Sequence, residues 1–239
     1  MKHAVAHSIR VEEIRKDRGN RSVRLLTSAA TVGRSGALDS GTRQFHTRIM
    51  VFQRKGNLPR LERHHYQGHA VVFWTNTLEE CARGWLTPAL HATFRDLMLH
   101  AAAREHLFCP AYCLMPDHLH LVWMGLRRDT DQLNAMTFLR RHLETVLGSG
   151  REWQHQPHDH VLRDEERRCN AFARFCFYVL ANPVRAELTK CESNWPYNGA
   201  IIPGYPSLHP LAEGYWKLFW KIYAAEREAE PSPPSAPPS

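Results

Sequence analysis

The alternation of hydrophobic and polar residues divides the middle of the chain into strands and helices. Residues 69–77 (HAVVFWTNT) are β-branched and aromatic, which is typical of a buried strand. Thr87 and Pro88 then form an N-cap and a first helical position, and apolar residues follow at helical spacing. The same reasoning predicts further strands at 108–114, 118–124 and 158–162, and further helices at about 133–146 and 165–181.

The order of these elements is β-α-β-β-α-β followed by one more helix. This order indicates an α+β, ferredoxin-like (RRM-like) antiparallel sheet. Residues 115–117 form a tight turn that joins two of the strands as a hairpin. We expect the third helix to end at Asn182-Pro183, because a proline disfavours helical geometry in the residue before it.

The two ends of the chain differ from its middle. Residues 1–60 are rich in Arg, Ser, Gly and Thr without an apolar period, so we expect a basic, disordered extension. Residues 226–239 include a Pro/Ser-rich stretch, which predicts a disordered tail. One domain, at 61–225, is therefore predicted within the 239 residues.

The formal net charge of +7 favours a polyanionic partner, and nucleic acid is the commonest polyanion. A basic protein without such a partner remains the alternative. The sequence has no apolar run of membrane-spanning length and no secretory signal, so we expect no membrane partner and a cytoplasmic location. The six cysteines are then reduced, and a single Cys-x₃-Cys spacing at Cys109 and Cys113 is a weak zinc signal.

His118 and His120 flank Leu119 on a predicted strand. Side chains alternate along a strand, so both imidazoles project from one face while Leu119, Leu121 and Trp123 pack on the other. Such a pair can offer two nitrogen atoms to one metal ion. Taken alone, it is more often two polar residues on a solvated strand face.

The third predicted helix adds candidate residues. Tyr178 lies on the flank of its apolar stripe, about 110° from the stripe centre, and Asn182 follows one turn later. A flank tyrosine is commonly a packed ring with a wet hydroxyl group. Arginines that either form a solvated face or bind phosphates surround this helix: Arg163, Arg167, Arg168, Arg174 and Arg185.

Several ordered blocks of the sequence carry a resemblance to a known family. They are CLMPDHLHLV at 113–122, WQ at 153–154, DHVLRDE at 159–165, FYVLANPVRA at 177–186 and WPY at 195–197. This pattern resembles the single-tyrosine HUH transposases, and among them the REP-associated tyrosine transposases. The resemblance covers roughly residues 60–199, and Asp117 departs from the Asn that commonly precedes the first histidine of the motif.

The resemblance implies a single-strand DNA endonuclease and strand transferase that forms a 5′-phosphotyrosine. His118, His120 and Asn182 would hold Mg²⁺ or Mn²⁺, and Tyr178, on the added helix, would be the nucleophile. Single-stranded or hairpin DNA would be the partner, bound by the five arginines, and the protein would be a monomer or a homodimer. Exposed aromatics can stack unpaired bases, but Trp74 and Trp123 are better explained as core residues.

Three alternatives compete with this interpretation. One is a non-catalytic nucleic-acid-binding module of the same fold. Another is a structural zinc protein that uses Cys109, Cys113, His118 and His120. The third is an unrelated metal-dependent phosphodiesterase, which would not need Tyr178.

Overall fold

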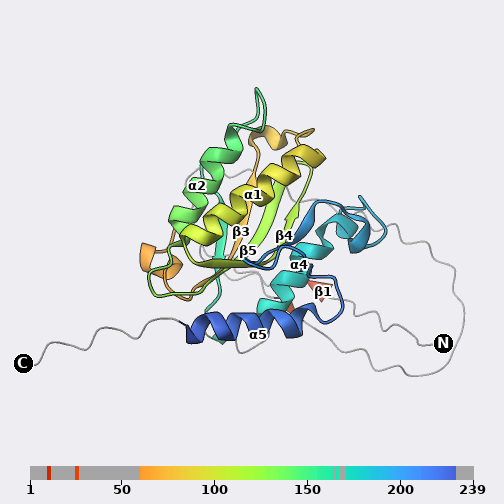
Figure 1. Ribbon diagram of the computed structural model, residues 1–239. Helices are drawn as coiled ribbons and strands as arrows, with labels where there is room; N and C mark the ends of the chain where they lie inside the picture. Colours follow the sequence, from red (N-terminus) through yellow and green to blue (C-terminus); the bar gives the residue numbers. More distant parts are fainter. Residues whose placement is uncertain (1–9, 12–24, 27–59, 164, 167–170, 230–239) are drawn as a thin grey trace, which may run out of the picture. The chain divides into compact units, whose positions relative to one another are not determined.

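The computed structural model describes residues 10–11, 25–26, 60–163, 165–166 and 171–229 (Figure 1). The chain divides into two units, residues 1–53 and 54–239. In the first unit, the two-residue strands β1 (Arg10–Val11) and β2 (Leu25–Leu26) pair antiparallel. The remaining predictions for residues 1–59 and 230–239 lie outside the described residues.

An antiparallel sheet of five strands forms the centre of the second unit. Its strand order is β6-β3-β5-β4-β7. The first four strands have the order expected of a ferredoxin-like sheet, and β7 extends its β4 edge. The strands are β3 (Val71–Thr77), β4 (Leu107–Leu114), β5 (His118–Gly125), β6 (His158–Val161) and β7 (Asn198–Ile201).

Four helices of eight residues or more are described in this unit. They are α1 (Pro88–Arg104), α2 (Gln132–Glu144), α4 (Ala171–Arg185) and α5 (Tyr215–Glu228). Thr87 caps α1 as predicted, since its side chain accepts a hydrogen bond from Leu90 N at 3.1 Å. The 3₁₀ turns are η1 (Arg63–Tyr66), η2 (Glu79–Cys81) and η3 (Glu192–Asn194). No helix among the described residues is both long and apolar enough to cross a membrane.

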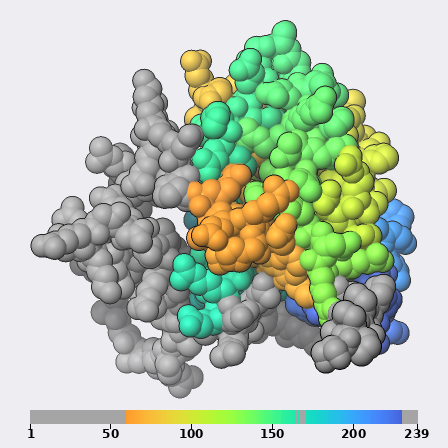
Figure 2. Space-filling view, turned by 90° about the vertical axis from the view of Figure 1, so that its left-hand side faces the viewer, coloured from red at the N-terminus to blue at the C-terminus, as the bar shows by residue number. Residues whose placement is uncertain are grey.

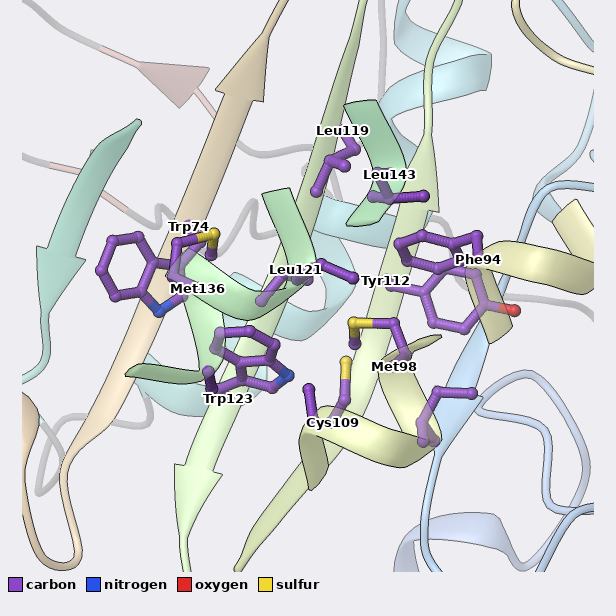
Figure 3. Packing of buried hydrophobic residues seen from close by; sticks show 14 of the residues in the cluster. Trp74, Phe94, Met98, Cys109, Tyr112, Leu119, Leu121, Trp123, Met136 and Leu143 are labelled. Atoms are coloured by element: carbon purple, nitrogen blue, oxygen red, sulfur yellow. The ribbon is translucent and has the colours of Figure 1, made fainter. Parts of the chain in front are cut away.

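The sheet is covered on both faces (Figure 1). Helices α1 and α2 pack on one face, where Trp74, Leu121 and Trp123 interleave with Phe94 and Met136 (Figure 3). Trp74 and Trp123 are fully buried there, which confirms that they are core residues. Beside this layer, the segment that contains η1 lies at the surface against the segment that contains α2 (Figure 2), with Arg63 Nε donating to Asp131 Oδ2 at 2.8 Å.

Helices α4 and α5 cover the second face. Val179 and Phe219 contribute to a core there with Phe73 and Phe108 from the sheet. The sequence predicted neither α5 nor β7. Helix α5 continues to Glu228, three residues into the segment assigned to the tail.

The predicted end of the third helix is wrong. Helix α4 continues through Asn182 and Pro183 to Arg185. Proline has no N–H to donate to the carbonyl of Val179 four residues earlier. The side chain of Asn182 fills the gap, since its Nδ2 lies 2.8 Å from Tyr178 O and 3.5 Å from Val179 O.

Candidate active site

The candidate site begins at the N-terminal end of β5, where strand alternation directs His118 and His120 to the α4 side of the sheet. The Nε2 atoms of the two rings are 3.0 Å apart. His120 is buried and His118 is partly exposed. The prediction that both imidazoles share one face, with Leu119, Leu121 and Trp123 on the other, is confirmed.

Two neighbouring side chains orient these rings. Asp117 Oδ1 lies 2.6 Å from His118 Nδ1, and Thr75 Oγ1 lies 2.9 Å from His120 Nδ1. The carboxylate of Asp117 can only accept, so the Nδ1 of His118 donates, and in the neutral ring its Nε2 carries a lone pair. When Nδ1 of His120 donates to Thr75, its Nε2 also presents a lone pair. Two lone pairs that face each other at this distance require a proton or a cation between them.

The spacing of the two nitrogen atoms fits a metal ion. Adjacent ligands of an octahedral ion, each about 2.1 Å from it, lie about 3.0 Å apart. The described residues contain no group of three or more His, Cys, Asp or Glu side chains that could hold a metal. A third ligand from the described residues would therefore be another kind of oxygen, from an amide, a hydroxyl group or a backbone carbonyl.

Burial keeps His120 in the form that a metal needs. Its pKa is held well below the ordinary value, first by burial and then by the positive charges of His118, Arg185 and His158. A neutral imidazole retains the nitrogen lone pair that binds a cation. The neutral His120 ring thus keeps a lone pair for a cation at neutral pH and below it.

The structural zinc alternative is wrong for its cysteines. Cys109 belongs to the core on the α1–α2 face, and Cys113 belongs to the core on the other face. Cys113 lies opposite His120 in the strand register, but its Sγ atom contacts Met115 Sδ at 3.8 Å. Burial raises the pKa of the Cys113 thiol to about 12, which disfavours the thiolate that zinc requires.

Helix α4 places Tyr178 over this pair of histidines. The Tyr178 ring is half-buried, and its centroid is 5.9 Å from that of His120 and 5.9 Å from that of Phe73. The guanidinium group of Arg185 lies 4.6 Å above the Tyr178 ring. The structure therefore brings the predicted nucleophile, the two predicted ligands and one predicted arginine into one cluster.

Asn182 lies in the same helix, one turn after Tyr178, and is buried. Its amide nitrogen is engaged with the backbone of the preceding turn, so its Oδ1 is the atom with which it would bind a metal. Its assignment as a ligand stays a prediction.

The other predicted arginines are more scattered. Arg163 is exposed at the end of β6, and Arg174 is half-buried in the first turn of α4. Arg167 and Arg168 lie outside the described residues. Of these arginines, Arg185 contacts the Tyr178 ring.

The sequence analysis missed a second His-x-His pair, His158 and His160 on β6. In the strand register, His158 lies opposite Thr75, which itself lies opposite His120, so the three side chains share one face. The His160 ring packs on Phe175, with centroids 5.1 Å apart, and its Nε2 is 3.0 Å from Glu166 Oε1. The repeated alternation of His158, Asp159 and His160 was the signal available for finding this pair.

Comparison with known proteins identifies relatives of the expected family. A relative from Haemophilus influenzae is 22% identical over 142 residues, which covers 54% of this chain and 78% of the relative. A relative from Escherichia coli K12 is 21% identical over 136 residues, covering 57% and 79% respectively. Both are named REP-associated tyrosine transposases, the first provisionally. This chain is a homologue of REP-associated tyrosine transposases.

The fold agrees with this relationship. A solved structure of a REP-associated tyrosine transposase bound to a REP hairpin superposes with a TM-score of 0.50 and 20% identity, covering 60% of this chain and 81% of that one. No family model matches the chain. The resemblance to the REP-associated transposases and the ferredoxin-like fold are thus both confirmed.

Proposed function

We propose that this protein is a single-strand DNA endonuclease and strand transferase that attacks with Tyr178 and uses a divalent metal ion. The observation that carries the proposal is the packing of the Tyr178 ring against His120, whose Nε2 faces that of His118 at 3.0 Å. The REP-associated relatives support DNA as the substrate.

The chemistry requires an oriented nucleophile. The Tyr178 oxygen would attack the scissile phosphorus, the bond from phosphorus to the 3′-oxygen would break, and the products would be a 5′-phosphotyrosine and a 3′-hydroxyl. The phenolic proton leaves to water and the departing 3′-oxygen gains one. Attack by another 3′-hydroxyl reverses the reaction and joins strands without an external energy source.

The residues around Tyr178 would each have a defined role. Packing on Phe73 and His120 holds the ring, and Arg185 above the ring provides a positive charge for a phosphate. A Mg²⁺ or Mn²⁺ ion bound by His118, His120 and Asn182 would polarise the phosphate and neutralise developing charge. Asp117 and Thr75 would hold the two imidazoles in the donor orientation.

A single strand is the form of DNA that suits this site. A scissile phosphate must approach a partly buried cluster on one sheet face, and a flexible strand reaches it more easily than a stiff duplex. The hairpin named for the solved relative supports a hairpin with single-stranded flanks as the substrate. The monomeric or dimeric state of the protein stays a prediction.

The decisive test removes one hydroxyl group. Tyr178→Phe keeps the ring and removes the hydroxyl group, so we expect the fold to persist and covalent attachment to vanish. The assay is denaturing electrophoresis with Mn²⁺ and 3′-labelled hairpin oligonucleotides taken from palindromes that flank the gene. Wild-type protein should give a slowly migrating, protease-sensitive adduct.

Tyr197→Phe is the matched control. The Tyr197 ring contacts His91 and Trp195, and this variant should retain the adduct. An adduct that persists in Tyr178→Phe would reject Tyr178 as the nucleophile. Binding without any wild-type adduct would favour the alternative of a non-catalytic DNA-binding module.

A further inference from the structure

An aromatic surface lies outside the proposed active site, along the seam between α4 and α5. Phe177 and Trp220 are exposed, with 54% and 43% of their surface accessible, and Trp216 is half-buried. Together with Phe172, their rings form a chain of contacts. The ring centroids are 6.2 Å apart for Phe177 and Trp216, 6.1 Å for Trp216 and Phe172, and 5.1 Å for Phe172 and Trp220. We call Phe177, Trp216 and Trp220 the aromatic track.

Core packing does not require the exposed parts of these rings. The buried stripe of α5 consists of Tyr215, Phe219 and Ile222. At 100° per residue, Trp216 and Trp220 lie roughly 90° to 130° from the centre of that stripe, on the side that faces α4. Exposed rings grouped in this way, unlike single scattered ones, are typical of a binding surface.

Two lysines accompany the track. Lys217 and Lys221 directly follow Trp216 and Trp220 in the sequence, and both are exposed. Each pair is therefore repeated after four residues, a rise of about 6 Å along the helix axis. Successive helical residues point about 100° apart, so the repeat offers two rings beside α4 and two positive charges on the adjoining exposed side of α5. Glu226 and Glu228 lie in the last turn of α5.

We propose that the aromatic track and its two lysines bind a single-stranded nucleic acid. Bases would stack on Trp220, Trp216 and Phe177, and the backbone phosphates would meet Lys217 and Lys221. A second copy of this chain fits less well. A self-complementary contact would bring these lysines close to their own copies, and lysine is depleted in protein interfaces.

The inference rests on the proposed function for the identity of the ligand, a single-stranded nucleic acid. The track ends at Phe177, the residue that precedes Tyr178 in α4. Successive helical residues point about 100° apart, and Phe177 contacts Trp216 of α5 whereas Tyr178 contacts Phe73 and His120, so the track and the candidate nucleophile lie on different sides of α4. The sequence blocks that resemble the transposase family end near residue 199, before α5 begins.

The test measures binding and not cleavage. It uses full-length Tyr178→Phe protein and labelled hairpins that carry a single-stranded flank on the 5′ side, on the 3′ side or on neither side. Fluorescence anisotropy gives the dissociation constant over a range of salt concentrations. In this parent, Trp220→Ala tests stacking, and the double variant Lys217→Ala, Lys221→Ala tests charge without removing a ring.

We expect Trp220→Ala to weaken binding of one flanked hairpin by about 5- to 100-fold and to leave the flankless hairpin unaffected. The double lysine variant should reduce the slope of log K against log salt by about 1.4, which corresponds to two phosphate contacts on a single strand. Leu218→Ala is the matched control, because Leu218 is 41% exposed on the opposite flank of α5. It should bind as the parent does.

Unchanged affinity for both flanked hairpins in both α5 variants would overturn the inference and leave the proposed function intact. Binding of no oligonucleotide by the parent would overturn both. Sedimentation adds one more outcome. If Trp220→Ala converts a dimer to a monomer without changing DNA affinity, the track is an interface between copies and the inference is wrong.

Discussion

The two faces of the central sheet are made by the same strands, yet they differ in what they do with polar groups. On the α1–α2 face, the polar side chain of Gln132 joins the core through two hydrogen bonds: Trp74 Nε1 donates to Gln132 Oε1 at 3.1 Å, and Gln132 Nε2 donates to Ala70 O at 2.8 Å. The Nε1 atoms of Trp123 and Trp153 are also buried on this face and have no hydrogen-bond partner among the described residues. This face is a closed core made mainly of aromatic and aliphatic side chains.

The α4–α5 face has the same kind of core at the α5 end, where Phe219 packs near Phe108. At the other end it holds Thr75, His118 and His120 beneath a half-buried Tyr178. The two Nε2 atoms there are 3.0 Å apart, and they are the pair that we propose as metal ligands. A hydrophobic core on one face thus supports a cluster of polar side chains at one end of the other face.

The strongest test of this comparison uses neighbouring residues on β5. His120→Ala removes a proposed ligand and should reduce cleavage by a hundred- to a thousand-fold or more. Leu121→Ala opens a cavity in the other face and should lower the free energy of unfolding by about 2–5 kcal/mol. Urea unfolding and adduct formation, measured for both variants, separate the two roles.

The two variants should have opposite effects on stability and on cleavage. His120→Ala should keep a cooperative unfolding transition with a smaller loss of stability than Leu121→Ala. Folded Leu121→Ala should retain adduct formation at low temperature. If cleavage by His120→Ala stays near the wild-type rate, the polar end of the second face is not a metal site.

Local pattern in the sequence was enough to predict most of the fold. Alternation on β5 separated His118 and His120 from Leu119 and Leu121, and the structure confirms this separation. The β-α-β-β-α-β order also holds. The separation of the side chains on β5 follows because side-chain direction in a strand depends on local geometry alone.

The sequence did not predict features that depend on distant partners. β7 has four residues including Gly199, and a Cβ at that position would lie 2.8 Å from the Tyr112 hydroxyl oxygen, so packing against β4 selects glycine there. The continuation of α4 past Pro183 is a local feature that the proline rule missed, since Asn182 Nδ2 bonds to Tyr178 O in the preceding turn. By contrast, α5 was readable, since Tyr215, Phe219 and Ile222 have helical spacing.

The site was predicted in part for the same reason. His118, His120 and Tyr178 belong to motifs, whereas Thr75 becomes relevant only because strand pairing places it opposite His120. His158 reaches the same row through a second pairing with Thr75. Residues that support a site through strand register are not visible without the sheet order.

A smaller effect is expected from a change at Thr75, which tests the orientation of the His120 ring alone. Thr75→Val keeps the shape of the side chain and removes the hydroxyl group that lies 2.9 Å from His120 Nδ1. Mn²⁺ affinity, measured by titration with electron paramagnetic resonance, should fall about 10- to 100-fold. Thr75→Ser should restore it, and equal affinity in Val and Ser variants would show that the hydroxyl group has no positioning role.

The smallest expected effect concerns pH and a histidine of the closed face. His91 contacts the Tyr112 hydroxyl at 2.9 Å, and burial, followed by the charge of Arg95, lowers the pKa of His91 to about 4. Unfolded histidine has a pKa near 6.5, so between about pH 4 and 6.5 the unfolded state binds more protons than the native state. Protonation therefore favours unfolding, and stability falls as the pH drops through that window and is insensitive to His91 above it.

His91→Gln should make the fall in stability shallower in urea unfolding measured from pH 4.5 to 7.5, while His120 still contributes with the same sign. His100→Gln, an exposed change on the same helix, is the control, and an identical pH dependence in His91→Gln and wild-type protein would show that His91 is not held neutral by the closed face.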